Sequence, residues 1–371
     1  MTVQALYDFS PLVRMLCVGL LLALGPLTWI WYQQRRATPL RRIRALTLLT
    51  LFLTFDLLLF GAFTRLTDSG LGCPDWPGCY GQASPLAAHG AIAAAQSAMP
   101  SGPVTHDKAW IEMIHRYLAT SVGVLMVVLA VAAWLGRRRQ SVQAGASVWW
   151  PTLTLLWVCL QGAFGALTVT MKLFPAIVTL HLLGGMVLLA LLCVQVVRLA
   201  QLDGAAPPVA LASPLRRLLW LSFALLALQV ALGGWVSTNY AVLACTDFPM
   251  CQGSWWPLMD FRQGFELWRE LGLTHSGATI GFAALTAIHY AHRLLALLVL
   301  ASLGLLAWRL GSVPALRRPA RWLAGLTALQ LATGLSNVLF DWPLLVAVLH
   351  TGGAAALVLV MSWTLAASRR A

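Results

Sequence analysis

The sequence predicts an all-α, polytopic membrane protein made of two pseudo-symmetric four-helix bundles, with one extra transmembrane helix at the N-terminus. Three observations lead to this fold class. Hydrophobic residues make up 59% of the 371 residues and charged residues only 10%, and the mean hydropathy is +0.77, so a soluble core cannot account for the apolar surface. Apolar runs of membrane-spanning length recur along the chain. Motifs in the first half of the chain also recur in the second half.

Nine apolar runs approach the roughly 20 residues that cross a hydrocarbon core of about 30 Å. They lie at 12–32, 45–64, 110–135, 148–170, 176–198, 216–236, 283–308, 321–340 and 344–367. The first run contains Pro26, which a transmembrane helix tolerates when neighbouring groups satisfy the freed carbonyl. Because this run lacks a basic segment before it and a small-residue cleavage site after it, we expect a retained helix rather than a signal peptide.

Arginines gather in every second connection between these runs. They include Arg35, Arg36, Arg41, Arg42, Arg44, Arg137, Arg138, Arg139, Arg198, Arg216, Arg217, Arg309, Arg317, Arg318, Arg321, Arg369 and Arg370. The alternate connections hold few cationic residues. The positive-inside rule therefore predicts an outer N-terminus and a cytoplasmic C-terminus. Topology explains most of the net charge of +13, so we expect no nucleic-acid partner.

Two long outer loops, about 65–109 and 237–282, carry the same pattern. TRLTDSGLGCPDWPGCYGQ and STNYAVLACTDFPMCQG align two cysteines, an aspartate and a proline in the same order. This registry predicts an internal repeat of four helices in each half. The predicted organisation is an extra helix with a basic linker at 1–44, an N-terminal half at 45–200, a cytoplasmic linker at 201–215 and a C-terminal half at 216–371.

The paired cysteines fall in the outer loops. Cys73 and Cys79 lie in the first loop, and Cys245 and Cys251 lie in the second. On the oxidising side of a membrane a disulfide can persist, and closing so short a loop would stabilise the fold by only about 2 kcal/mol. Each pair is thus either a structural disulfide that closes the loop or a redox-responsive dithiol. A zinc site is disfavoured, because neither loop offers four obvious ligands around its cysteines.

Four histidines occupy matched places in the predicted helices. His115 and His181 in the first half correspond to His292 and His350 in the second. Each lies 17 to 22 residues from the next inner arginine, about 25 to 33 Å along a helix, which places all four near the outer edge of the membrane. A single intramembrane histidine can be explained by an interhelical hydrogen bond. Two matched pairs on facing helices favour axial ligation of haem iron.

The residue three places before the first histidine of each pair breaks the symmetry. Glu112 precedes His115, whereas His289 precedes His292 on nearly the same helix face. A carboxylate near the membrane edge is costly unless it is paired or solvated, so Glu112 is the candidate general base or charge-stabilising group. The alternative is a helix N-terminal acid favoured by the macrodipole. The asymmetry predicts one catalytic site and one electron-transfer site.

Three arginines could bind anionic groups at the same depth. Arg116 and Arg293 directly follow the ligand histidines, and Arg65 ends the preceding outward helix. Each side chain can extend to the interface, where haem propionates also lie. We therefore expect Arg116 to bind the substrate haem, and we regard Arg65 and Arg293 as further propionate candidates.

These motifs together resemble the haem A synthase family. The resemblance is carried by GAFTRLTDSGLGCPDWPGCYG, EMIHR, HLLGG, HYAHR and LHTGG, and it covers about 45–368. It implies that His115 and His181 flank the substrate haem O, that Glu112 is the catalytic acid or base, and that His292 and His350 ligate haem b. It also implies a Cys73–Cys79 disulfide. The extra helix at 12–32 departs from the eight-helix family pattern, and the Cys245–Cys251 pair is not universal in the family.

The resemblance further implies an oxidoreductase. Two successive hydroxylations of one methyl group, with water as the oxygen source, would convert haem O to haem A while electrons leave through haem b. It implies a bacterial inner-membrane location with periplasmic cysteine loops. The expected partners are lipid, a haem O synthase, terminal oxidase assembly factors, an unidentified electron acceptor and a second copy of the chain. The alternatives are a dihaem b-type cytochrome, which needs the four histidines but not Glu112, and a haem-handling protein.

Overall fold

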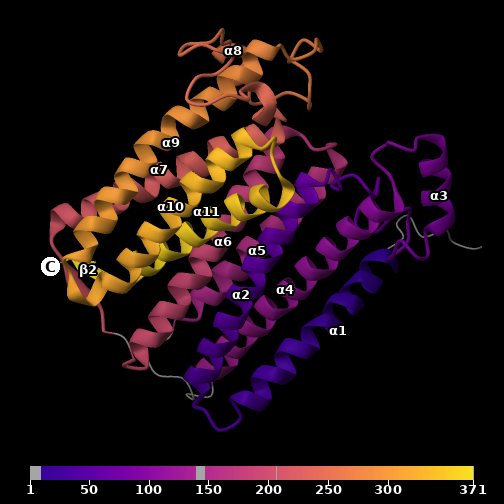
Figure 1. Cartoon of the computed structure of the whole chain (residues 1–371). Helices are drawn as coiled ribbons and strands as arrows, with labels where there is room; N and C mark the ends of the chain where they lie inside the picture. The colour runs from indigo at the N-terminus through magenta and orange to yellow at the C-terminus, as the bar shows by residue number, and fades with distance from the viewer. Residues whose placement is uncertain (1–9, 139–146, 206, 371) are drawn as a thin grey trace, which may run out of the picture. The chain divides into compact units, whose positions relative to one another are not determined.

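The computed structural model describes residues 10–138, 147–205 and 207–370. These residues form two compact units, one ending at Leu173 and the other beginning at Phe174. Residues 1–9 of the predicted N-terminal segment, Arg139 of the inner arginines, residue 206 of the linker and residue 371 lie outside the described residues. Figure 1 shows that most of the described chain is helical, with two long loops that contain only short helices.

The first unit contains four long helices and one short helix. They are α1 Ser10–Gln33, α2 Pro39–Leu66, α3 His89–Ala98, α4 His106–Arg138 and α5 Trp149–Thr170. Proline is favoured in the first turn of a helix, where its missing N–H costs no hydrogen bond. Accordingly, Pro39 opens α2, and the Thr38 side chain caps the helix by accepting a hydrogen bond from the Arg41 amide. Helix α3 lies within what the sequence suggested was an uninterrupted loop.

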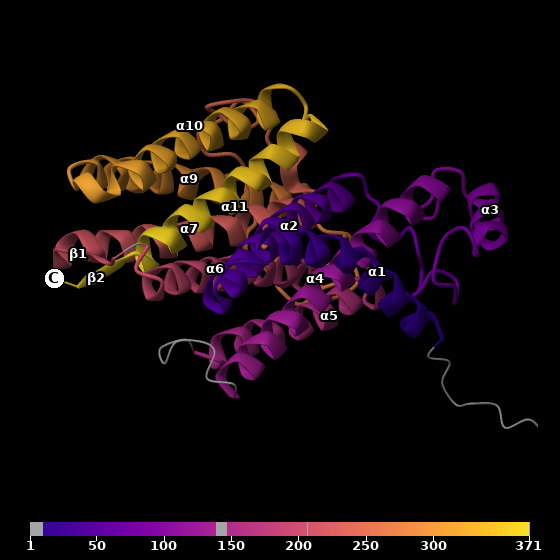
Figure 2. The same ribbon diagram turned by 90° about the horizontal axis from the view of Figure 1, so that it is seen from below.

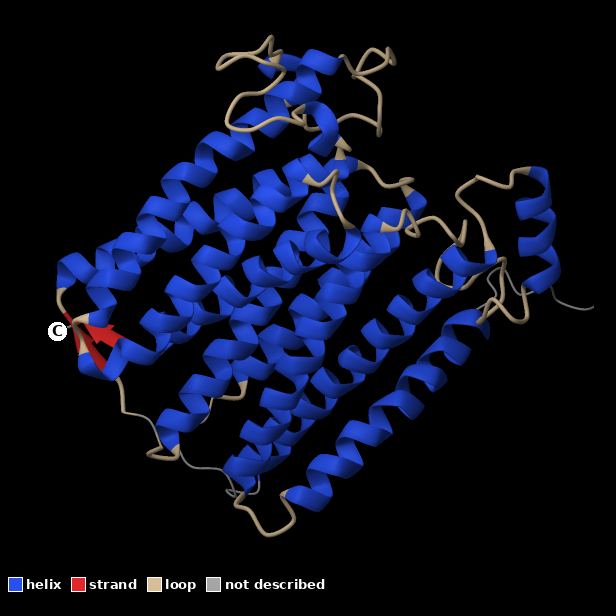
Figure 3. Ribbon diagram, viewed as in Figure 1, coloured by secondary structure: helices blue, strands red, loops and turns tan. Residues whose placement is uncertain are grey.

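The second unit contains the other long helices. Its elements are α6 Pro175–Leu202, β1 Val209–Leu211, α7 Ser213–Thr238, η1 Ala241–Ala244, α8 Phe261–Gly264, α9 Phe282–Gly311, η2 Pro314–Leu316, α10 Arg317–Leu339, α11 Leu344–Ala366 and β2 Ser368–Arg370. Figure 3 shows the two strands side by side next to the C-terminus. They pair in parallel, with Val209 opposite Ser368, and so join the predicted linker to the end of the chain.

Within the described residues, eight helices are long and apolar enough to cross a membrane. This confirms the prediction of an all-α polytopic membrane protein. The remaining predicted span, 321–340, corresponds to α10, which forms over 23 residues but falls outside that group of eight. Its first turns carry Arg317, Arg318 and Arg321, and Gln330 and Asn337 lie further along. The crossing of the membrane by α10 therefore stays a prediction.

Packing within the second unit groups α6 with the helices that follow it. Helix α7 packs on α9, α9 on α10, α10 on α11, and α6 on both α7 and α11. At the end of the unit that carries the C-terminus, Gln201 donates to the Ala366 carbonyl at 2.9 Å and Arg216 donates to the Ser368 carbonyl at 3.1 Å. These units reflect packing rather than repeat boundaries, so the division of the repeat at 45–200 and 216–371 stays a prediction.

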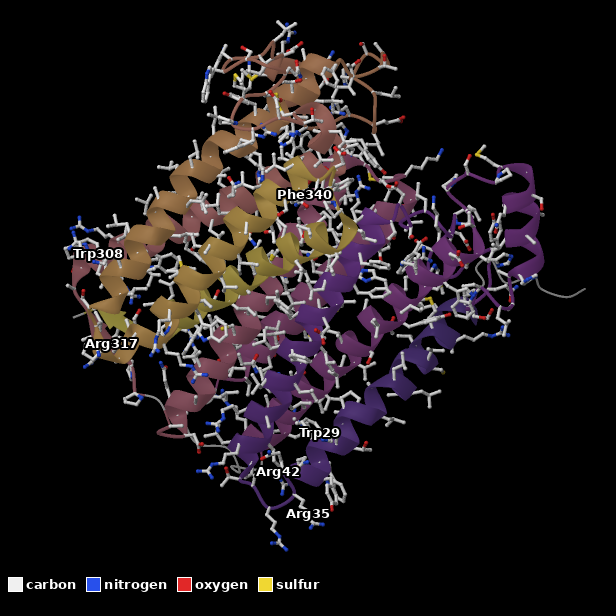
Figure 4. The ribbon with its side chains drawn as sticks, viewed as in Figure 1. Trp29, Arg35, Arg42, Trp308, Arg317 and Phe340 are labelled. Atoms are coloured by element: carbon white, nitrogen blue, oxygen red, sulfur yellow. A yellow bond between two sulfur atoms is a disulfide. The ribbon has the colours of Figure 1, made fainter. Side chains whose placement is uncertain are left out.

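In each unit, the arginine-rich turns and the cysteine loops lie at opposite ends of the helices. Arg35 and Arg42 lie at the turn between α1 and α2 (Figure 4), where Arg42 donates to the Gln34 carbonyl at 2.9 Å. In the second unit, Arg317 lies at the start of α10, away from Phe340 at its other end. This separation agrees with the charge pattern, and which end faces the cytoplasm stays a prediction.

The extra helix α1 runs alongside α4 in both views (Figures 1 and 2). Its buried residues include Pro11, Met15, Gly19 and Ala23, which recur every four residues and so share one face. At one end of this face, Met15 packs in a cluster with both cysteines of the first loop. Helix α1 therefore buries part of the loop that carries the candidate site.

Close packing at Gly19 predicts a sharp steric effect. A Cβ at this position would meet the Thr120 side chain and would lie 3.1 Å from the Thr120 backbone carbon. We expect Gly19→Ala to lower the stability of the purified protein by about 1 to 3 kcal/mol through overpacking, measured as a lower thermal unfolding midpoint in detergent. Gly123→Ala is the matched control, because its Cβ would meet nothing within 4 Å and alanine favours a helix by about 1 kcal/mol. Equal midpoints for both variants would contradict the α1–α4 contact.

Candidate functional site

Each outer loop is closed by a disulfide between cysteines six residues apart. Cys73 bonds to Cys79 and Cys245 bonds to Cys251, and all four cysteines are fully buried. The Cα–Cα separation is 4.9 Å in both pairs, within the ordinary range for disulfides. The redox behaviour of either pair stays a prediction.

An aspartate organises the inside of each loop. Asp75 accepts from the backbone amides of Tyr80 and Gly81 at 2.6 and 2.7 Å. Asp247 accepts from those of Gln252 and Gly253 at 2.7 and 2.9 Å. Hydrogen bonds to a carboxylate favour its charged form, and the Gly253 amide in particular holds the pKa of Asp247 below its ordinary value. The alignment of the two aspartates thus reflects a shared loop structure.

The arginine after each candidate ligand binds the loop backbone. Arg116 Nη1 donates to the carbonyls of Asp75, Pro77 and Gly78 at 3.0, 3.2 and 2.5 Å. Arg293 does the same in the second half. Its Nη1 donates to the carbonyls of Asp247 and Met250 at 2.8 and 3.1 Å, and its Nη2 donates to that of Cys245 at 2.7 Å. These two arginines therefore fasten equivalent loops to equivalent helices.

Glu112 lies buried between α4 and the first loop, with a side-chain exposure of only 5%. One carboxylate oxygen, Oε1, pairs with Arg116 Nη2 at 2.5 Å, and the other, Oε2, accepts from the Cys73 amide at 2.8 Å. The loop can come this close because residue 72 is a glycine, whose Cβ would overlap the backbone of Lys108 and Ala109. The predicted carboxylate is thus ion-paired and held on both oxygens.

His289 stands where Glu112 stands in the first half, and it is also buried. Its Nε2 accepts from Arg293 Nε at 3.3 Å, and the backbone of Ala241 and Val242 lies beside its ring. Residue 244, the equivalent of Gly72, is an alanine. The second half therefore keeps the arginine and the loop but has no carboxylate at this point.

The rings of His115 and His292 pack against equivalent glycines. A Cβ at Gly61 on α2 would lie 3.0 Å from His115 Cε1, and a Cβ at Gly233 on α7 would lie 3.0 Å from His292 Cε1. The His115 ring also stacks on Phe60, with centroids 6.2 Å apart. The two glycines have the same spacing to the first cysteine of their loops, so extending the repeat alignment upstream would have found them.

The hydroxyl of Thr333 lies beside the ring of His350. Thr333 Oγ1 donates to the Leu329 carbonyl at 2.8 Å and lies 2.8 Å from His350 Nδ1. With its hydrogen directed at that carbonyl, Oγ1 can accept from Nδ1–H, which would leave the Nε2 lone pair available. A Cβ at Gly334 would lie 3.3 Å from the same ring. No pattern in the sequence singles out Thr333, because threonines are frequent in the helices.

His292 lies close enough to His350 for the two rings to interact electrostatically. Both residues belong to the second unit, and their ligation of one haem stays a prediction. Gln229 Nε2 donates to the backbone carbonyl of His292 at 3.1 Å and lies 3.1 Å from Nδ1 of the same residue, while Gln229 Oε1 is buried without a hydrogen-bond partner.

The two histidines predicted to flank the substrate haem lie in different units. His181 lies on α6 in the second unit, and its Nδ1 is buried without a hydrogen-bond partner. His115 lies on α4 in the first unit, so the pairing of His115 with His181 stays a prediction.

Arg65, a predicted propionate ligand, lies at the end of α2 and forms an ion pair with Asp68 at 3.1 Å.

Comparisons with known proteins match most of the chain. The model of a family described as COX15-CtaA, cytochrome oxidase assembly protein, matches residues 44–362, so α1 precedes the match. A protein named heme A synthase from Shewanella oneidensis is 38% identical over 313 residues, which cover 84% of this chain and 92% of the relative. A heme A synthase from Rhodospirillum centenum is 29% identical over 90% of this chain and 90% of the relative. One from Symbiobacterium thermophilum is 29% identical over 84% of this chain and 91% of the relative.

Proposed function

This chain belongs to the COX15-CtaA family of cytochrome oxidase assembly proteins, and on that premise we propose that it is a haem A synthase. The proposed reaction oxidises one methyl group of haem O to the formyl group of haem A. The observation that carries this proposal is the buried carboxylate of Glu112, one helical turn before His115, with a histidine in its place in the second half. An electron carrier needs the histidines but has no use for this carboxylate.

The second histidine pair has the chemistry of a haem b site. Metal-bound imidazoles usually donate their other ring N–H to a fixed acceptor, and Thr333 is such an acceptor for His350. Glycines at positions 233 and 334 let the two rings pack closely against the neighbouring helices. We propose that His292 and His350 hold haem b, which when bound would carry electrons away from the substrate site to an unidentified acceptor.

The first half would bind haem O as substrate. We propose that His115 and His181 flank the macrocycle and that Glu112 acts on its edge. Each hydroxylation takes two electrons and two protons from the methyl group and water together, and the second gives a geminal diol that loses water to form the aldehyde. Glu112 would accept a proton from the attacking water or stabilise positive charge on the carbon. Burial of Glu112 beneath the loop limits its contact with bulk water.

We also propose a bacterial inner-membrane location. The arginine-rich turns would face the cytoplasm, and both disulfide loops would face the periplasm. The haem O supplier, the oxidase assembly factors that receive haem A and a second copy of this chain are the proposed partners.

Pigment analysis tests the proposed function directly. The full chain would be expressed in a bacterium that makes haem O but has no haem A synthase of its own, and haems extracted from the purified protein would be separated by chromatography. We expect haem A or haem O together with haem b, and haem A in the membranes. Haem b alone, with no haem A in the membranes, would contradict the proposal and favour the dihaem electron carrier.

A further inference from the structure

We propose that Arg116 is a positioning residue, which orients Glu112 and holds the first disulfide loop over it, and that it does not bind a haem propionate. This inference rests on the proposed function, because it concerns the carboxylate that would carry out the reaction. It reassigns a residue that the sequence alone placed at the substrate haem.

The hydrogen bonds of Arg116 leave little capacity for a propionate. The guanidinium has five N–H donors in a fixed plane. Nη1 has two hydrogens and is surrounded by three loop carbonyls, while Nη2 pairs with Glu112. The side chain is 8% exposed. These bonds and the burial of the side chain favour a role within the protein over binding of a propionate.

Glu112 is fixed from two directions. Arg116, one turn further along α4, holds Oε1, and the Cys73 amide of the loop holds Oε2. Arg116 also binds the loop that supplies this amide, so a single side chain controls both contacts. Catalytic groups must be held close to their productive geometry, and displacements of about 1 Å can cost 10²-fold in rate. Arginine also supplies the counter-charge that a buried carboxylate needs.

The second half separates the two tasks of this arginine. Arg293 binds the carbonyls of Cys245, Asp247 and Met250 and has His289 where Arg116 has Glu112, so fastening the loop does not require a carboxylate at that position. In the first half, two differences occur together. Glu112 replaces the histidine, and Gly72 replaces the alanine and lets the loop reach α4. The carboxylate contact is thus an addition to a shared scaffold.

The test compares Arg116→Gln with Tyr117→Phe in the full-length protein. Tyr117 follows Arg116 on α4, and its hydroxyl donates to the Ala83 carbonyl of the same loop at 2.5 Å without contacting Glu112. We expect Arg116→Gln to lower haem A formation per bound haem O by at least about tenfold while haem O content stays within twofold of the wild type. Tyr117→Phe should keep haem A formation within about twofold, because arginine still holds the carboxylate.

A conservative variant and a double variant separate positioning from general structure. Arg116→Lys keeps the positive charge but not the planar fork, so it should restore part of the rate lost in Arg116→Gln. Combining Arg116→Gln with Glu112→Gln should be no slower than Glu112→Gln alone, because both changes disable the same group. Additive losses would mean that Arg116 acts independently of Glu112 and would overturn the proposal.

Gly72→Ala approaches the same contact from the loop. The added methyl would overlap the α4 backbone and move the Cys73 amide away from Glu112, so haem A formation should fall while haem O content is retained. This variant also tests the proposal if Arg116→Gln does not fold. Loss of bound haem O in proportion to activity in Arg116→Lys would indicate a propionate anchor and overturn the proposal. If the wild-type protein forms no haem A, the proposed function fails instead, so the two failures are distinguishable.

Discussion

Replacing Glu112 with glutamine should stop haem A formation while leaving the bound haems in place. Glutamine keeps the size of the side chain and an oxygen that can accept from the Cys73 amide, but it cannot accept a proton or supply negative charge. Loss of a positioned general base costs about 10² to 10⁴-fold in rate. The measurement is the ratio of haem A to haem O in membranes that contain equal amounts of the variant and the wild-type protein.

The control for this variant is Glu270→Gln, which makes the same chemical change at an exposed position in the second outer loop. It should leave the ratio of haem A to haem O unchanged. Retained haem b in Glu112→Gln would show that the fold is intact. A haem A yield equal to that of the wild type would exclude Glu112 from the chemistry and leave the dihaem cytochrome as the better account of the four histidines.

Replacing His292 or His350 with alanine should remove haem b. Each variant leaves one axial ligand for the iron and opens space beside Gly233 or Gly334. We expect loss of most of the b-type absorbance in the reduced-minus-oxidised spectrum of the purified protein. Thr333→Val should have a smaller effect, because it removes only the acceptor for His350 Nδ1, and loss of such outer partners costs about 10 to 100-fold in metal affinity.

His275→Ala is the matched control for the histidine variants. His275 is exposed in the second outer loop, so its removal should leave the spectrum unchanged. A wild-type content of haem b in both His292→Ala and His350→Ala would refute the assignment of this pair. Reduced haem A formation in the same variants, with haem O still bound, would connect the second site to electron transfer.

Much of the fold could be predicted from the sequence because long helices depend on one strong signal. Apolar runs at 12–32 and 110–135 became α1 Ser10–Gln33 and α4 His106–Arg138, with ends extended by polar turns that hydropathy does not detect. Helix α3 was missed because its ten residues are too few to span a membrane and contain a single large apolar side chain, Ile92. For α10, the apolar run was recognised, but its arginines and amides lower the mean hydropathy of the whole helix.

The candidate site was only partly predictable. Repeat symmetry identified Glu112 as an exception, but it could not show that Arg116 binds Glu112 rather than a propionate, since a guanidinium at that position suits either partner. The choice depends on where the loop carbonyls lie, and that is set by the contact of Gly72 with α4. Gln229 was missed because the first half has leucine at the equivalent position, so comparison of the two halves did not point to it.

The two disulfide loops are held through backbone atoms, with arginine binding carbonyls and aspartate binding amides. Such contacts do not depend on which side chains the intervening residues carry. Each loop could therefore differ in its outer side chains while keeping the same shape. The loops CPDWPGC and CTDFPMC share only the two cysteines, the aspartate and one proline. One copy could in this way acquire a new chemical group while its fold was already secured.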